Sequence, residues 1–260
     1  MSEAAKTGEK DEALEETTLL SHLIELRSRL LKIALAVVLV FLVLIPWARQ
    51  IFALVSEPLR EVLPGNAMIA TAVASPLLTP FKLTFFVALF IAMPVVLYQV
   101  WAFVAPGLYK KEKRFAMPLL ASSIALFYLG IAFAYYLVFP LIFGFFTAVA
   151  PEGVEVQTDI SLFLDFITTI VFAFGLAFEV PIATVLIVWT GLTTPEKLGK
   201  ARPYVFLGAF IGGMLLTPPD VISQTLLAVP VYILYELGIL MARIFSSREE
   251  VAGDEAEPAD

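Results

Sequence analysis

Long apolar runs, separated by short polar stretches, follow one another along most of this chain. Six of them cover residues 31–47, 83–105, 115–139, 166–189, 204–216 and 221–240. A helix rises about 1.5 Å per residue, so about 20 apolar residues cross a hydrocarbon core of about 30 Å. The pattern therefore predicts an all-α, polytopic membrane protein with six transmembrane helices.

Prolines lie in or beside every run after the first: Pro94, Pro118, Pro140, Pro181, Pro203 and Pro230. Proline removes a backbone donor and collides with the carbonyl four residues earlier, so we expect a concave bundle of kinked helices. The fifth run, 204–216, would give only about 20 Å of helix, and it turns at once into the sixth. We therefore expect short fifth and sixth spans beside a locally thinned bilayer.

The positions of lysine and arginine predict the orientation. With a cytoplasmic N-terminus, every Lys and Arg lies in a cytoplasmic segment or tail except Arg49, Arg60 and Lys82. Such a bias is typical of the inside of a membrane protein. We expect a multi-pass protein of the cytoplasmic (inner) membrane with both termini in the cytoplasm. Lys82 itself is expected to extend toward the outer surface.

The net charge of −7 comes from the two ends of the chain, which are rich in Asp and Glu. Low hydrophobicity and high charge are typical of disorder. We therefore divide the chain into a disordered acidic tail at 1–18, a membrane domain at 19–245 and a second disordered acidic tail at 246–260.

Composition also excludes several chemistries. The chain has no cysteine and one histidine, His22, so it predicts no thiol chemistry and no histidine-based metal site. The stretch GLTTPEKLGK has the wrong spacing for a phosphate-binding loop, and no hydrolase motif is present. We expect no enzyme, no cofactor and no nucleic-acid partner.

Two acids stand near the cytoplasmic ends of long runs. Glu25 lies in a helix whose Leu19, Leu23, Leu26 and Leu30 share one face, which predicts an amphipathic helix at the interface. Glu112 lies among lysines and Arg114. Glu25 could simply pair with Arg29, and Glu112 could be a charge spacer. Together they suit guanidinium recognition, because a carboxylate accepts two parallel bonds from arginine and not from lysine.

Glu179 is the one ionisable residue in the run 166–189. An acid at that depth costs about 2.5–3.5 kcal/mol on insertion scales, so it should face protein, a partner or water. Pro181, two residues later, predicts a kink there. We expect Glu179 to be a docking point for a polar residue of a partner helix.

Several stretches closely resemble the TatC family, the core subunits of the twin-arginine protein translocase. They are SHLIELRSRLL at 21–31, VASPLLTPFKLTF at 73–85, YQVWAFVAPGLYKKEKR at 98–114, FGLAFEVP at 174–181 and GMLLTPPDVISQTLLAVPVY at 213–232. The resemblance covers about residues 19–245. It implies a receptor for the Ser-Arg-Arg-x-Phe-Leu-Lys signal of folded precursors, which works in multiple copies with TatA and TatB and uses the proton-motive force.

The resemblance also assigns residues. Signal-peptide binding falls on Glu25, Arg27, Phe103, Leu108 and Glu112. Partner binding by TatA and TatB falls on Glu179, Met214, Thr217 and Gln224. Pro58 and Asp220 match structural or partner-related positions. Ser28, Lys111 and Lys113 depart from residues that are common in the family and leave the detailed preference of the pocket open.

Two other functions are compatible with the residues alone. An ion- or proton-coupled secondary transporter would use Glu179 as its proton site, although such transporters often show repeats and this sequence has none. A membrane scaffold would carry its acids incidentally. It would not distinguish arginine from lysine in any ligand.

Overall fold

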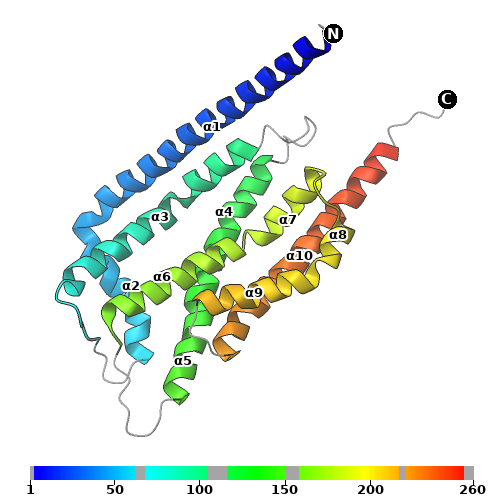
Figure 1. Ribbon diagram of the computed structural model, residues 1–260. Helices are drawn as coiled ribbons and strands as arrows, with labels where there is room; N and C mark the ends of the chain where they lie inside the picture. Colours follow the sequence, from blue (N-terminus) through cyan, green and yellow to red (C-terminus); the bar gives the residue numbers. More distant parts are fainter. Residues whose placement is uncertain (1–2, 63–67, 105–115, 150–157, 217–220, 255–260) are drawn as a thin grey trace.

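The computed structural model describes residues 3–62, 68–104, 116–149, 158–216 and 221–254. Its regular structure is helical (Figure 1), with an isolated parallel bridge between Ile69 and Asp159. The elements are α1 (Glu3–Leu44), a 3₁₀ turn (Ile45–Trp47), α2 (Ala48–Val62), α3 (Ser75–Val104), α4 (Ala116–Phe133), a π-helical segment (Ala134–Val138), α5 (Phe139–Val149), α6 (Ile160–Ala177), α7 (Val180–Trp189), α8 (Pro195–Lys200), α9 (Arg202–Leu216) and α10 (Val221–Asp254).

The all-helical membrane class predicted from the apolar runs is confirmed. Within the described residues, five helical stretches are long and apolar enough to cross a bilayer: Leu23–Glu57, Ser75–Phe103, Met117–Phe146, Ile160–Trp189 and Gln224–Ile244. The fifth run forms α9, which has only 15 residues, or about 22 Å of helix. A sixth crossing therefore depends on α9 and stays a prediction, as do the concave shape and the side on which the termini lie.

The expectation of a short sixth span is wrong. The apolar part of α10 has 21 residues, enough for about 32 Å of helix. The predicted run 221–240 already has 20 residues and includes Glu236, and its shortness is inferred only from its pairing with the fifth run. In the structure the apolar stretch extends to Ile244. Among the apolar stretches expected to span the membrane, and within the described residues, α9 is the one shorter than the hydrocarbon core.

The predicted interfacial helix before the first run is also not separate. α1 continues without interruption from Glu3 to Leu44, so the leucines near residue 26 and the first apolar run share one helix. No proline occurs before Pro46, and leucine, glutamate and arginine favour helix. The helices α1 and α10 also include residues 3–18 and 246–254. The division into a membrane domain and two disordered acidic tails stays a prediction.

Two interruptions follow from prolines, as the sequence predicts. α6 ends at Ala177 and α7 begins at Val180, so Glu179 and Pro181 lie at a break within one apolar stretch. The π-helical segment Ala134–Val138 directly precedes Phe139 and Pro140. A wider turn accommodates the proline ring, which would otherwise collide with the carbonyl of Tyr136.

The helices form a bundle in which α1 occupies one edge and α8, α9 and α10 lie toward the opposite edge (Figure 1). α1 packs on α3, α4 packs on α6, and α10 packs on both α7 and α9. Figure 1 places the start of α1 and the end of α10 at the same end of the bundle. That arrangement agrees with an even number of crossings.

Two glycines bring two pairs of helices into close contact, α4 with α6 and α10 with α7. A Cβ on Gly130 of α4 would lie 2.5 Å from the carbonyl oxygen of Phe174 in α6. A Cβ on Gly238 of α10 would lie 2.1 Å from Oγ1 of Thr184 and 3.0 Å from Cα of Pro181, both in α7. The backbones approach this closely only because these positions carry no side chain.

Candidate functional site

A polar network joins the middle of α1 to the end of α3. Arg29 donates from Nε and Nη2 to Oε1 of Glu25, at 3.0 and 2.5 Å. The same guanidinium donates from Nη1 to Oε1 of Gln99 at 3.3 Å and from Nη2 to the carbonyl oxygen of Ala102 at 2.9 Å. The sequence left open that Glu25 simply forms an ion pair with Arg29, one turn later. The structure contains this ion pair.

This network leaves Glu25 partly accessible. Its side chain is 38% exposed, whereas that of Arg29 is 18% exposed. Both donors from Arg29 reach the same oxygen, and Oε2 has no hydrogen-bond partner among the residues that the structure describes. A carboxylate oxygen can accept two hydrogen bonds, so Glu25 can accept further donors while Arg29 stays in place.

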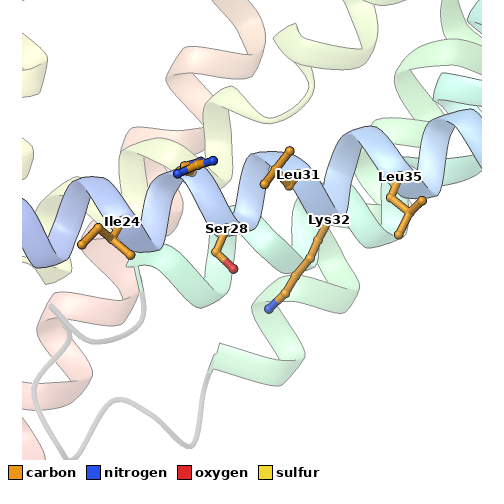
Figure 2. A pocket seen from close by; sticks show the side chains of 6 residues that line it. Ile24, Ser28, Leu31, Lys32 and Leu35 are labelled. Atoms are coloured by element: carbon orange, nitrogen blue, oxygen red, sulfur yellow. The ribbon is translucent and has the colours of Figure 1, made fainter.

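Arg27 lies on a different face of α1 from this network. It lines a shallow hollow of about 360 Å³ with Ile24, Ser28, Leu31, Lys32 and Leu35. Figure 2 shows Ser28 and Lys32 on one side of the helix and Leu31 above them. The structure thus separates two predicted signal-binding residues, Glu25 toward α3 and Arg27 toward the exposed hollow.

The other predicted signal-binding residues are only partly described. Phe103 follows Ala102, whose carbonyl accepts from Arg29, so it lies at the same end of α3 as the Glu25 network. Leu108 and Glu112 fall outside the described residues. The structure brings Glu25 and Phe103 near one another and does not place the second acid.

Glu179 is held at the break between α6 and α7. Its Oε2 accepts from Oγ of Ser123, a fully buried residue of α4, at 2.5 Å. Its Oε1 is screened from solvent and has no hydrogen-bond partner within the described part of the chain. The sequence predicts the kink and the need of Glu179 for a hydrogen-bonding partner. It does not identify Ser123, whose hydroxyl donates to one of the two carboxylate oxygens.

The predicted partner-binding residues at the far edge are described in part. Met214, at the end of α9, is 52% exposed, and Gln224, near the start of α10, is half-buried. Gly213 brings these helices together, because its Cβ would lie 3.5 Å from the carbonyl oxygen of Gln224. Pro58 lies within α2. Thr217 and Asp220 fall outside the described residues.

A second acid within an apolar stretch escapes the sequence analysis. Glu236 lies in the apolar part of α10 and accepts a bidentate pair from Arg202 of α9, with Nε–Oε1 and Nη2–Oε2 both 2.7 Å. Two parallel bonds to a guanidinium are the strongest form of such a pair. This ion pair explains how an acid is accommodated in the apolar stretch. In the sequence, the feature that could have indicated it is Arg202, just before the fifth run.

Lys82 is also engaged in a way the sequence does not predict. Its Nζ donates to Oδ1 of Asp165, an ion pair between α3 and α6 in which both side chains are about half exposed. The expectation that Lys82 extends toward the outer surface stays a prediction, because its ion pair with Asp165 is itself exposed. The acid was available in the sequence, but nothing in the spacing of these residues indicated that the two helices are neighbours.

A clasp formed by Thr71 and Asp159 closes the end of the bundle near α2. Asp159 caps α6 by accepting from the backbone N–H groups of Ser161 and Leu162, at 2.8 and 3.2 Å. Its other oxygen accepts from N and Oγ1 of Thr71, at 2.9 and 2.6 Å. Hydrogen bonds to the ionised form, those of Thr71 foremost, lower the pKa of Asp159 to about 2.

The clasp predicts an acid-sensitive stability. The pKa of Asp159 is lower in the folded protein than its ordinary value of 3.8, so its contribution is present above that value and is lost as the pH falls toward 2. We expect the melting temperature in detergent to fall over this range more steeply for the parent than for Asp159→Asn. Parallel curves for the two proteins would contradict the prediction.

Among the described residues, no group of three or more His, Cys, Asp or Glu side chains lies together where it could bind a metal ion. The acids discussed above each have a named donor within the described residues: Glu25 has Arg29, Asp159 has Thr71, Asp165 has Lys82, Glu179 has Ser123 and Glu236 has Arg202.

Comparison with known proteins gives a consistent result. Residues 21–230 match the family described as Sec-independent protein translocase protein (TatC). The TatC proteins of Azotobacter chroococcum mcd 1 and Escherichia coli (strain K12) are each 58% identical, over 238 and 228 residues. These matches cover 91% and 87% of this chain and 93% and 88% of the two relatives.

Solved structures agree with the sequence relatives. The crystal structure of the twin arginine translocase receptor TatC superposes with a TM-score of 0.77 at 35% sequence identity. The match covers 86% of this chain and 98% of the crystallised one. At this identity the likeness extends beyond the general helical architecture.

Proposed function

Because this chain belongs to the TatC family of Sec-independent protein translocase proteins, we propose that it binds the twin-arginine signal peptides of folded precursor proteins at the cytoplasmic face of the membrane. It then recruits TatA and TatB for export driven by the proton-motive force. As a translocase component it is not an enzyme. Family membership also displaces the secondary-transporter and scaffold alternatives that the residues alone left open.

The observation that carries this proposal is the guanidinium bound to Glu25. An acid 38% exposed on α1 already accepts two hydrogen bonds from an arginine of its own chain. The site is therefore chemically suited to guanidinium. An incoming arginine can match the two oxygens of this carboxylate with its planar fork, whereas a lysine ammonium makes a point contact.

The remaining residues of the proposed signal site complete this picture. Glu112 supplies a second carboxylate for the second arginine of the signal. Phe103 and Leu108 offer apolar surface to the Phe-Leu part of the motif, and Arg27 belongs to the same recognition segment. Phe103 lies beside the Glu25 network at the end of α3, which supports grouping it with Glu25.

The proposed partner site lies along α9 and the start of α10. Met214 is exposed and Gln224 is half-buried, and the proposal adds Thr217, which lies outside the described residues. Glu179 offers a polar point within the membrane for a TatA or TatB helix. The positions of Gly208 and Gly212 support this surface, because no described atom lies within 4 Å of a Cβ at either one, so another helix can approach closely.

The topology of the proposal places both termini in the cytoplasm of a cell with an inner membrane, with several copies of the chain in each complex. Pro58 and Asp220 have structural or partner-related roles in the segments on the opposite side. The lysine and arginine bias supports this orientation. The start of α1 and the end of α10, which lie at the same end of the bundle in Figure 1, support a common side for the two tails.

Replacing Glu25 by alanine should lower the affinity for a twin-arginine signal peptide by about tenfold, because one charge-assisted hydrogen-bond pair is lost. The double variant Glu25→Ala/Glu112→Ala should in addition lose the preference for twin-arginine over twin-lysine peptides. The measurement is the yield of photo-crosslinks to purified protein as a function of peptide concentration, with both peptides in parallel.

Glu196→Ala is the matched control, since it removes an exposed acid from α8, outside the proposed site. It should bind both peptides like the parent. Undiminished selectivity in the double variant would overturn the assignment of the two acids, whereas an equal loss in the control would indicate a general effect of charge.

A further inference from the structure

We infer that Arg29 is an in-chain competitor of the signal's arginine, an inference that rests on the proposed function of Glu25. In the structure Arg29 directs Nε and Nη2 at Oε1 of Glu25. An incoming guanidinium that grips the carboxylate through both oxygens must displace Arg29 from Oε1. The unoccupied Glu25 site is thereby kept neutral and ordered until a ligand of the same chemistry replaces the internal one.

The geometry distinguishes arginine from lysine at this step. With Arg29 in place, Oε2 alone lacks a described partner. A lysine ammonium needs one oxygen, so it can bind at Oε2 without moving Arg29. Arg29 places two donors on Oε1 alone, whereas a fork-to-fork arginine pair uses both oxygens, so an arginine ligand that forms this pair competes with Arg29 and a lysine ligand does not.

Arg29 keeps two other acceptors when it is displaced from Glu25. Its Nη1 already donates to Oε1 of Gln99, and its Nη2 donates to the carbonyl oxygen of Ala102. Gln99 is 9% exposed, so this amide is a fixed acceptor inside the α1 and α3 contact. The displaced guanidinium therefore keeps hydrogen-bond partners on α3 and does not have to remain buried without any, which would be costly.

The test measures how tightly two peptides bind full-length protein in nanodiscs. The peptides carry Ser-Arg-Arg-x-Phe-Leu-Lys or its twin-lysine counterpart. Arg29→Met removes the donors at similar side-chain length. It should increase the affinity for the twin-arginine peptide by about two- to sixfold, the factor expected when a partly exposed ion pair no longer competes. The twin-lysine peptide should change much less.

Lys32→Met is the control for charge. It removes a cation from the same helix at the exposed hollow (Figure 2), and Lys32 takes no part in the hydrogen bonds of Glu25 and Arg29 within the described residues. It should leave the ratio of the two affinities unchanged. If Arg29→Met tightens both peptides equally, the effect is one of net charge and the inference is wrong. Weaker binding of the twin-arginine peptide would also overturn it, because Arg29 would then position Glu25.

A second variant tests the acceptor on α3. Gln99→Leu removes one partner of displaced Arg29, so it should weaken the twin-arginine peptide in the parent and have no effect in the Arg29→Met background. Equal effects in both backgrounds would contradict the inference. Arg29→Gln replaces Arg29→Met if the latter does not fold. If the parent shows no preference for the twin-arginine peptide, the proposed function itself is wrong. If the parent shows this preference but Arg29→Met does not increase the affinity for the twin-arginine peptide, only the inference about Arg29 is wrong.

Discussion

Gly130→Ala should lower the free energy of unfolding by about 2 kcal/mol, the net of an overpacked contact and a better helix former. The new Cβ would lie 2.5 Å from the carbonyl oxygen of Phe174 and 3.0 Å from Cγ of Phe178. A backbone oxygen cannot rotate away, so α4 and α6 must separate. For a chain of this size the melting temperature in detergent should fall by about 5 °C.

Gly208→Ala is the matched control for this change. It lies in α9, and no described atom comes within 4 Å of its added Cβ. Alanine favours helix over glycine by about 1 kcal/mol, so this variant should melt at the same temperature as the parent or slightly higher. If both variants melt alike, the contact between α4 and α6 does not depend on Gly130.

Glu179→Leu should weaken the binding of a labelled TatA or TatB transmembrane helix by about thirtyfold, equivalent to about 2 kcal/mol. The carboxylate oxygen Oε1 has no described hydrogen-bond partner, so a polar residue of the partner would satisfy it. Leucine removes that acceptor inside the membrane, where water offers no substitute. Fluorescence titration in nanodiscs gives the affinity directly.

Glu179→Gln separates hydrogen bonding from charge in this prediction. Glutamine keeps an acceptor oxygen and can still receive the Ser123 hydroxyl, so it should retain most of the affinity. Glu196→Leu, an acid replaced outside the spans, controls for the loss of charge and should bind like the parent. If Glu179→Leu and Glu179→Gln both bind as the parent does, Glu179 serves another purpose.

The periodicity of apolar residues predicted most of the architecture, because bilayer length and backbone hydrogen bonding leave few alternatives. The break at Glu179 was also predictable, since Pro181 removes a specific hydrogen bond. Helix ends were not. α1 runs through the expected interfacial boundary, because a polar face does not end a helix, and α10 continues beyond residue 240 to Asp254.

The candidate site was predictable only in part, for a similar reason. The acids Glu25 and Glu179 stand out in the sequence because isolated carboxylates are rare in such surroundings. Their in-chain partners do not stand out. Gln99 and Ser123 are small polar residues within apolar runs, and their importance depends on which helices are neighbours, α1 with α3 and α4 with the α6 and α7 break.

The Thr71–Asp159 clasp has a consequence for the order of biogenesis. Its two residues are 88 positions apart, and α3, α4 and α5 lie between them. A chain inserted from its N-terminus therefore presents Thr71 long before Asp159 arrives at the same side of the membrane. The segment before α3 must wait, without this partner, until two further crossings are in place. When the N-terminus of α6 reaches that side, the hydrogen bonds between Thr71 and Asp159 connect the segment before α3 to α6.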